Sequence, residues 1–139
     1  MPEPIASVTT HLTALLEPIT PTCQVIHGDI AGNMLWTDTS RPAVIDFSPY
    51  WRPAPYATAI AITDAVLWYN ADAANLVDST GAELDQHLVR ALLFRLSVDG
   101  LQILDPGSGV TPSSSHVHWN IDHAMPLIEL LERGRAAPR

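Results

Sequence analysis

Apolar residues recur at spacings of three and four positions over most of the chain, and this periodicity predicts helices. The predicted helices cover residues 5–16, a segment that starts at Tyr56, and residues 71–78, 82–98 and 116–133. The helix from Tyr56 is apolar nearly all round, which indicates a central position in the core. Ser7 and Gly134 are the predicted caps of the first and last helices, and Pro126 is expected to kink the last one.

A different pattern follows the first helix, where short apolar runs alternate with polar and turn residues. Residues 23–27 predict a strand that leads into a polar loop. Residues 34–37 and 43–47 predict the two strands of a hairpin. The proline-rich stretch 48–55 that comes next predicts an extended loop.

Together these elements predict a single domain over residues 1–139, of the α+β class and mainly α. Its small β-hairpin part covers residues 23–47, and its helical part, residues 56–134, contributes most of the four or five helices expected in all. A chain of 139 residues with 47% hydrophobic and 16% charged residues is large and apolar enough to bury a core.

The net charge is −8, because seven basic residues, all arginine, are outnumbered by fifteen Asp and Glu. This balance argues against nucleic acid and anionic membranes as partners, since phosphate groups are bound mainly through Lys and Arg. It suits a cationic substrate, although acidity commonly serves solubility alone. The single cysteine, Cys23, excludes an internal disulfide. Neither a signal peptide nor a membrane span is predicted, so we expect a cytoplasmic protein.

Two carboxylates and a carboxamide, Asp29, Asn33 and Asp46, stand where the apolar runs of the β part stop. Oxygen ligands on rigid strand ends are what Mg²⁺ requires, and a free carboxylate beside them can orient a hydroxyl for attack on a phosphoryl group. The alternative is that Asp29 and Asn33 make turn hydrogen bonds and Asp46 caps a loop, as such residues commonly do. The apolar strand on each side favours the first interpretation.

The same residues resemble the aminoglycoside phosphotransferase family of small-molecule kinases, which shares the protein-kinase fold. The matching elements are His27-Gly28-Asp29, Asn33 and Ile45-Asp46-Phe47. The aromatic and proline-rich continuation at residues 48–53 resembles an actinobacterial branch of this family rather than its known antibiotic-resistance enzymes.

The resemblance implies the C-terminal lobe of a kinase-like fold, with its catalytic loop in the β part. It implies that Asp29 is the catalytic base and that His27 is a catalytic-loop residue that braces it by a side-chain hydrogen bond. Asn33 and Asp46 are the implied ligands of Mg²⁺ and, through the metal, of ATP.

Gly28 and Asp64 are the expected supports of this loop. Gly28 permits a tight backbone path, and Asp64 resembles the helix residue that ties down the catalytic loop in such folds. The chain departs from the family in spacing, because Asn33 follows Asp29 by four positions and the loop is therefore one residue short. Gly32 is expected to let the backbone compensate.

The chain contains no lysine and no glycine-rich loop before His27, the features that pair and cover nucleotide phosphates in kinase-fold enzymes. Arg52 is a candidate replacement for the charge of the lysine. The chain is therefore expected to be a C-terminal lobe only, either a truncated reading of a longer gene or a stand-alone remnant. Poor or absent catalysis is expected of it in isolation.

Two functions stay open. The first is an ATP- and Mg²⁺-dependent phosphotransferase that acts on a hydroxyl of a small molecule. The second is a non-catalytic kinase-like remnant that serves as a binding or oligomerising module. In either case the surface that an N-terminal lobe would cover predicts a homo-oligomer or a partner chain.

Two further groups of residues have candidate chemistry. His116, His118 and His123 raise the possibility of a zinc site, which their spacing on a helix disfavours. The aromatic residues of the middle of the chain are candidates for either a substrate pocket or the core: Tyr50, Trp51, Tyr56, Trp68 and Tyr69.

Overall fold

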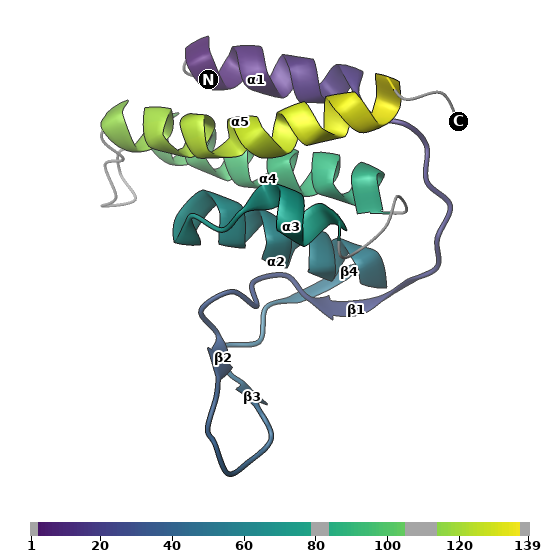
Figure 1. Cartoon of the computed structure of the whole chain (residues 1–139), viewed down its shortest axis with the longest axis vertical. Coiled ribbons are helices and arrows are strands. Elements are labelled where there is room, and N and C mark those ends of the chain that lie inside the picture. Colours follow the sequence, from purple (N-terminus) through teal and green to yellow (C-terminus); the bar gives the residue numbers. More distant parts are fainter. Residues whose placement is uncertain (1–2, 79–83, 105–113, 137–139) are drawn as a thin grey trace.

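A computed structural model of the chain shows a stack of helices with a small β region along one side, from which a hairpin protrudes (Figure 1). It describes residues 3–78, 84–104 and 114–136. The helices are α1 (Glu3–Ala14), α2 (Ala54–Tyr69), α3 (Ala73–Asp78), α4 (Asp85–Leu104) and α5 (Ser114–Ala136). The strands are β1 (Cys23–His27), β2 (Met34–Leu35), β3 (Ala43–Val44) and β4 (Pro49–Pro53). These elements confirm the predicted class, α+β and mainly helical.

Helix α2 occupies the centre of the molecule, as its apolar sequence predicted. It packs against α4, α5 and α3 and also against β1 and β4, so almost every side of it is covered. Its buried residues accordingly come from consecutive as well as helically spaced positions: Tyr56, Ala59, Ile60, Ile62, Thr63, Asp64, Val66 and Leu67. Helix α4 contributes Leu88, Leu92 and Leu96 to the same core. The two polar members of α2, Thr63 and Asp64, are as fully buried as its leucine.

The ends of α2 are set by its sequence. Pro53 precedes the first helical residue and Pro55 lies in the first turn, where a missing N–H is tolerated. At the other end Asn70 adopts a left-handed backbone with φ 53°, and its N–H bonds to the carbonyl of Ala65. Asparagine tolerates this conformation better than most residues, so the helix stops there.

The two short antiparallel ribbons are nested in one another. β1 pairs with β4 from Cys23↔Pro53 to His27↔Pro49, and β2 pairs with β3 within the connection between them. The predicted hairpin at 34–37 and 43–47 is confirmed in shorter form. Figure 1 shows this inner hairpin extending away from the helices.

The prediction of an extended loop over residues 48–55 was wrong, because Pro49–Pro53 forms β4 and Ala54 begins α2. The bond from the N–H of Gly28 to the carbonyl of Ser48 fixes which pairs of the ribbon are hydrogen-bonded. Hydrogen-bonded and non-hydrogen-bonded pairs alternate, so Pro49 and Pro53 both fall at non-hydrogen-bonded pairs. The missing N–H groups of the prolines are therefore not needed, and the strand forms despite them.

The predicted helix ends also need correction. Ser7 lies inside α1, which begins at Glu3, and its predicted capping role was wrong. Gly134 lies inside α5, so it is not the C-cap. Pro126 also lies within α5. The glycine- and proline-rich stretch 105–115 also predicts a loop, and this stretch falls mostly outside the described residues.

None of the helices in the described part of the chain is both long and apolar enough to cross a bilayer.

Leu92→Ala tests the central position of the α2–α4 core. Leu92 is fully buried, and its truncation is expected to lower the free energy of unfolding by about 2–5 kcal/mol because a cavity replaces its side chain. Leu101 lies on the same helix with 63% of its surface exposed, so Leu101→Ala should change the free energy of unfolding by less than about 0.5 kcal/mol. Urea denaturation measures both. Equal losses in the two variants would contradict this packing.

Candidate functional site

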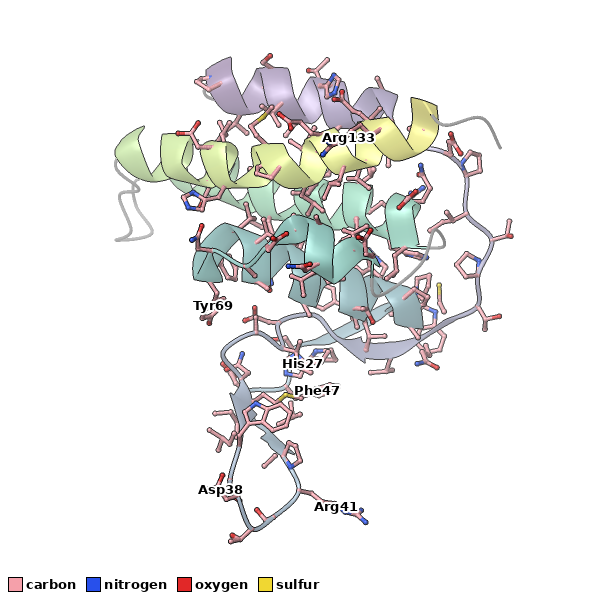
Figure 2. The ribbon with its side chains drawn as sticks, viewed as in Figure 1. His27, Asp38, Arg41, Phe47, Tyr69 and Arg133 are labelled. Carbon is pink, nitrogen blue, oxygen red and sulfur yellow. The ribbon has the colours of Figure 1, made fainter. Side chains whose placement is uncertain are left out.

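The predicted site residues lie where the helical stack meets the protruding hairpin. Figure 2 shows His27 and Phe47 at this junction, whereas Asp38 and Arg41 mark the tip of the hairpin. The loop from Gly28 to Asn33 connects β1 to β2, and the segment from Ile45 to Ser48 connects β3 to β4. Because the ribbons are nested, these two connections run beside each other, and the chain brings its separated polar residues together here.

His27 is the brace of the loop. Its Nδ1 accepts a hydrogen bond from the backbone N–H of Asp29 at 3.0 Å, so Nε2 carries the proton of a neutral ring. That Nε2–H lies 3.4 Å from the carbonyl of Ile45, across the neighbouring connection. The ring also stacks edge-to-face with Phe47, with centroids 5.3 Å apart. Both nitrogens of this buried imidazole face the backbone, which suits the bracing part of its predicted role.

Asn33 is fixed through its backbone and its side-chain nitrogen. Its Nδ2 donates to the carbonyl of Asp29 at 2.8 Å, and its own carbonyl accepts from the N–H of Ile45 at 3.0 Å. Gly32 precedes it with φ 80°, a left-handed conformation that glycine adopts without strain. These contacts leave Oδ1 as the part of the carboxamide that is available to a cation. The short loop therefore keeps Asn33 directly beside the strand that leads to Asp46.

Asp46 has an unusual backbone for an aspartate. Its φ of 49° lies in the left-handed region, which costs a non-glycine residue roughly 1 kcal/mol or more. Hydrogen bonds on both sides hold it there, from the N–H of Ile45 to Asn33 and from Gly28 to the carbonyl of Ser48. The carboxylate is exposed and has no hydrogen bond or ion pair within the described ranges. It is therefore a free anionic oxygen pair next to Asn33.

The most strongly bonded group at the site is one that the sequence did not reveal. Arg95 of α4 reaches Asp64 of α2 with two hydrogen bonds, Nε to Oδ1 at 2.6 Å and Nη2 to Oδ2 at 2.5 Å. The same Nη2 donates to Oδ1 of Asp29 at 3.1 Å. The guanidinium lies over the rings of Trp68 and Phe94, at 4.9 and 5.1 Å from their centroids. Asp64 is thus connected to Asp29 of the loop through this arginine and not directly.

The charges of this triad depend on one another. Burial raises the pKa of Asp64, while the hydrogen bonds and charge of Arg95 oppose that rise. Burial alone would lower the pKa of Arg95, but the hydrogen bonds and charges of Asp64 and Asp29 raise it above its ordinary value. Arg95 therefore keeps its positive charge, and that charge holds two carboxylates in one orientation.

Gly28 is required here for space. A Cβ atom at this position would lie 2.0 Å from Cδ2 of Tyr50, the residue two places after Ser48 on β4. Tyr50 in turn stacks edge-to-face with Phe94, at 6.0 Å between centroids. A side chain at position 28 would therefore collide with the Tyr50 ring as it is placed here.

A cavity of about 520 Å³ lies between this loop and the first half of α2. Ile30, Gly32, Met34 and Trp36 line it from the loop and hairpin, and Ala57, Thr58 and Ala61 line it from the helix. Its wall is mostly apolar. It begins at the residue directly after Asp29.

The remaining candidates lie apart from this site. Arg52 is exposed, and its Nη1 donates to the carbonyl of Trp51 at 2.9 Å. The side chains of His116 and His118 fall outside the described part of the structure. In the part that is described, no three His, Cys, Asp or Glu side chains converge as a metal site would require.

Neither a protein-family model, nor a curated protein, nor a solved structure matches the chain.

Arg95→Met tests the ion-pair triad. This change leaves Asp64 buried without a charged partner, and the free energy of unfolding is expected to fall by about 3–5 kcal/mol. The double variant Asp64→Leu/Arg95→Met removes both buried charges and should recover much of that loss. Urea denaturation measures both, with exposed Arg133→Met as the control that leaves stability unchanged. A double variant that is less stable than Arg95→Met would show that the pair does not act as a unit.

Proposed function

We propose that the chain is the catalytic-loop part of an ATP- and Mg²⁺-dependent phosphotransferase of kinase-like fold, acting on a hydroxyl group of a small molecule in the cytoplasm. One observation carries the proposal. Three oxygen-bearing side chains, Asp29, Asn33 and Asp46, are brought to one junction by nested ribbons, and uncommitted oxygens remain on each. Residues that served only as turn caps would have used these oxygens for local hydrogen bonds.

The metal part of the proposal fits this donor set. Asp46 offers an exposed carboxylate and Asn33 offers Oδ1, and hard oxygen ligands of this kind suit Mg²⁺, which retains waters and binds phosphate oxygens as well. When bound, the ion would neutralise charge on the nucleotide phosphates. The strained backbone of Asp46 supports the assignment, because strain of this kind concentrates at functional sites.

Asp29 is the proposed base. Arg95 occupies Oδ1 of its carboxylate at 3.1 Å, so Oδ2 is the oxygen that can accept or orient the proton of an attacking hydroxyl. His27 holds the backbone N–H of the same residue, and Asn33 holds its carbonyl. The backbone of Asp29 is therefore held by two bonds and its carboxylate by one, while 43% of the side-chain surface stays exposed to an acceptor. The apolar cavity next to Ile30 is the proposed acceptor pocket.

A second observation favours the alternative of a binding or oligomerising module. The β region has an exposed surface with many large apolar side chains: Val25, Leu35, Trp36, Val44, Phe47 and Trp51. Val25 and Trp51 are cross-strand partners with 56% and 64% of their surfaces exposed. Exposed apolar side chains gathered in one region typically meet a partner. We propose that a second copy or another chain covers this surface, where a nucleotide-binding lobe would lie.

Calorimetric titration with Mg²⁺-ATP tests the nucleotide site. Asp46→Asn keeps a residue that tolerates the left-handed backbone but removes the anionic ligand, and we expect binding to weaken about tenfold or more. Asp38→Asn, at the hairpin tip (Figure 2), removes the same charge away from the site and should bind as the unmodified protein does. Asp29→Asn should leave Mg²⁺-ATP binding intact, because Asp29 is the proposed base and not a proposed metal ligand.

Two results together would refute the nucleotide site. The first is that Mg²⁺-ATP does not bind to the protein. The second is that Mg²⁺ changes the melting temperature of Asp46→Asn and of Asp38→Asn by the same amount.

Trp51→Ser tests the partner surface. If a second copy covers the β region, this variant should sediment as a smaller species, because aromatic side chains dominate the energy of such interfaces. Leu101→Ser changes an equally exposed apolar residue on α4 and should not alter the sedimentation. Analytical ultracentrifugation measures both. A monomer at all concentrations would rule out self-association and leave another chain as the partner.

A further inference from the structure

A second cavity, of about 300 Å³, lies at the opposite end of the β1–β4 ribbon from the catalytic loop. It is lined by Ile19, Arg52, Pro53, Tyr56, His87 and Arg90. Pro53 pairs with Cys23 at this end, whereas His27 pairs with Pro49 at the other end. Cys23 and His27 are four residue steps apart along β1, which corresponds to about 13 Å. The cavity is therefore distinct from the site around Asp29.

The cavity carries positive charge that no carboxylate of the described residues pairs with. Arg90 donates to three neutral oxygens, the carbonyl and Oε1 of Gln86 at 2.8 Å each and the carbonyl of Glu17 at 2.7 Å. Arg52 donates to the carbonyl of Trp51. Neither arginine has a carboxylate partner among the ion pairs of the described residues. In a chain with net charge −8, two uncompensated guanidiniums at one small cavity form a local anion-attracting field.

Two further polar groups complete the wall. His87 is only 4% exposed, and its Nδ1 has no hydrogen-bond partner in the described part of the chain. A buried polar atom without a partner is costly. Burial, and then the charge of Arg90, lower the pKa of His87, so the ring is neutral and can donate through one nitrogen. Burial raises the pKa of Tyr56, against the charges of Arg52 and Arg90, and its hydroxyl stays a donor.

An adjoining cavity of about 480 Å³ shares Ile19 and His87 with the cavity of about 300 Å³. Pro18, Pro21 and Pro55 contribute rigid apolar surface to it. The two cavities together offer a compartment lined by two arginines for a head group and one lined by no Arg, Asp or Glu for the body of a small molecule.

We propose that this cavity is a binding site for the oxyanion group, phosphate or carboxylate, of a small molecule. Arg52 and Arg90 supply the charge, and Tyr56 and His87 supply neutral donors. Planar guanidiniums match both kinds of oxyanion. The site does not rest on the proposed phosphotransferase activity, because it shares no residue with the catalytic loop.

Calorimetric titrations with inorganic phosphate and with acetate, at one fixed ionic strength, test this site. Saturable binding of either anion is expected, and the two titrations show which oxyanion the site prefers. Arg52→Gln removes one of the two guanidiniums, and it should weaken anion binding about tenfold. Within the protein this guanidinium bonds to the carbonyl of Trp51. Arg41→Gln, at the hairpin tip (Figure 2), is the matched control and should not change binding. Tyr56→Phe is a second variant that removes only the hydroxyl and should also weaken binding.

Nuclear magnetic resonance of the imidazoles gives an independent measurement. The ring signals of His87 should shift in proportion to the amount of the preferred anion that is bound. The ring signals of His11, which lies on α1 and pairs with Glu132, should not shift. The proposal is overturned if neither anion binds saturably up to about 10 mM. It is equally overturned if Arg41→Gln weakens binding as much as Arg52→Gln, or if His11 responds as His87 does.

Discussion

The arrangement of the site depends on the buried ion pair between Asp64 and Arg95. Each charge would be unfavourable alone in the core, and each is accommodated because two hydrogen bonds of 2.5–2.6 Å join them. Such a pair is seldom a better source of stability than apolar packing. Its value here lies in geometry. It joins α2 to α4, and its third hydrogen bond extends that rigid connection to Asp29.

The loop between β1 and β2 is held in a single conformation by what surrounds it. Arg95 fixes the side chain of Asp29, while His27 and Asn33 fix its N–H and carbonyl. Because the loop is short, Asn33 bonds directly to Ile45, and this places Asp46 beside it with a left-handed backbone. The strain at Asp46 is thus a consequence of how tightly the two connections are joined, and it is offset by the hydrogen bonds on each side.

The sequence allowed the local parts of this arrangement to be predicted and concealed the distant ones. The hairpin and the grouping of Asp29, Asn33 and Asp46 follow from strand patterns within one stretch of the chain, residues 23–47. Arg95 lies 31 and 66 residues from its two partners, in a helix whose apolar spacing gives no sign that one position faces a carboxylate. β4 was missed for another reason, since prolines normally exclude a strand and only the alternation of hydrogen-bonded pairs accommodates them here.

The helical and β parts of the molecule differ in how completely they are packed, and this difference bears on function. The helices enclose a continuous core, whereas the ribbons have two strands each and expose Trp36, Phe47 and Trp51. Two-stranded ribbons are marginal in water by themselves and need packing on one face. The proposed metal ligands Asn33 and Asp46 lie in the connections between these strands, and electrostatic stabilisation of a reacting phosphate is strongest when water is excluded. A partner on the exposed apolar surface would therefore stabilise the ribbons and shield the site through the same contact.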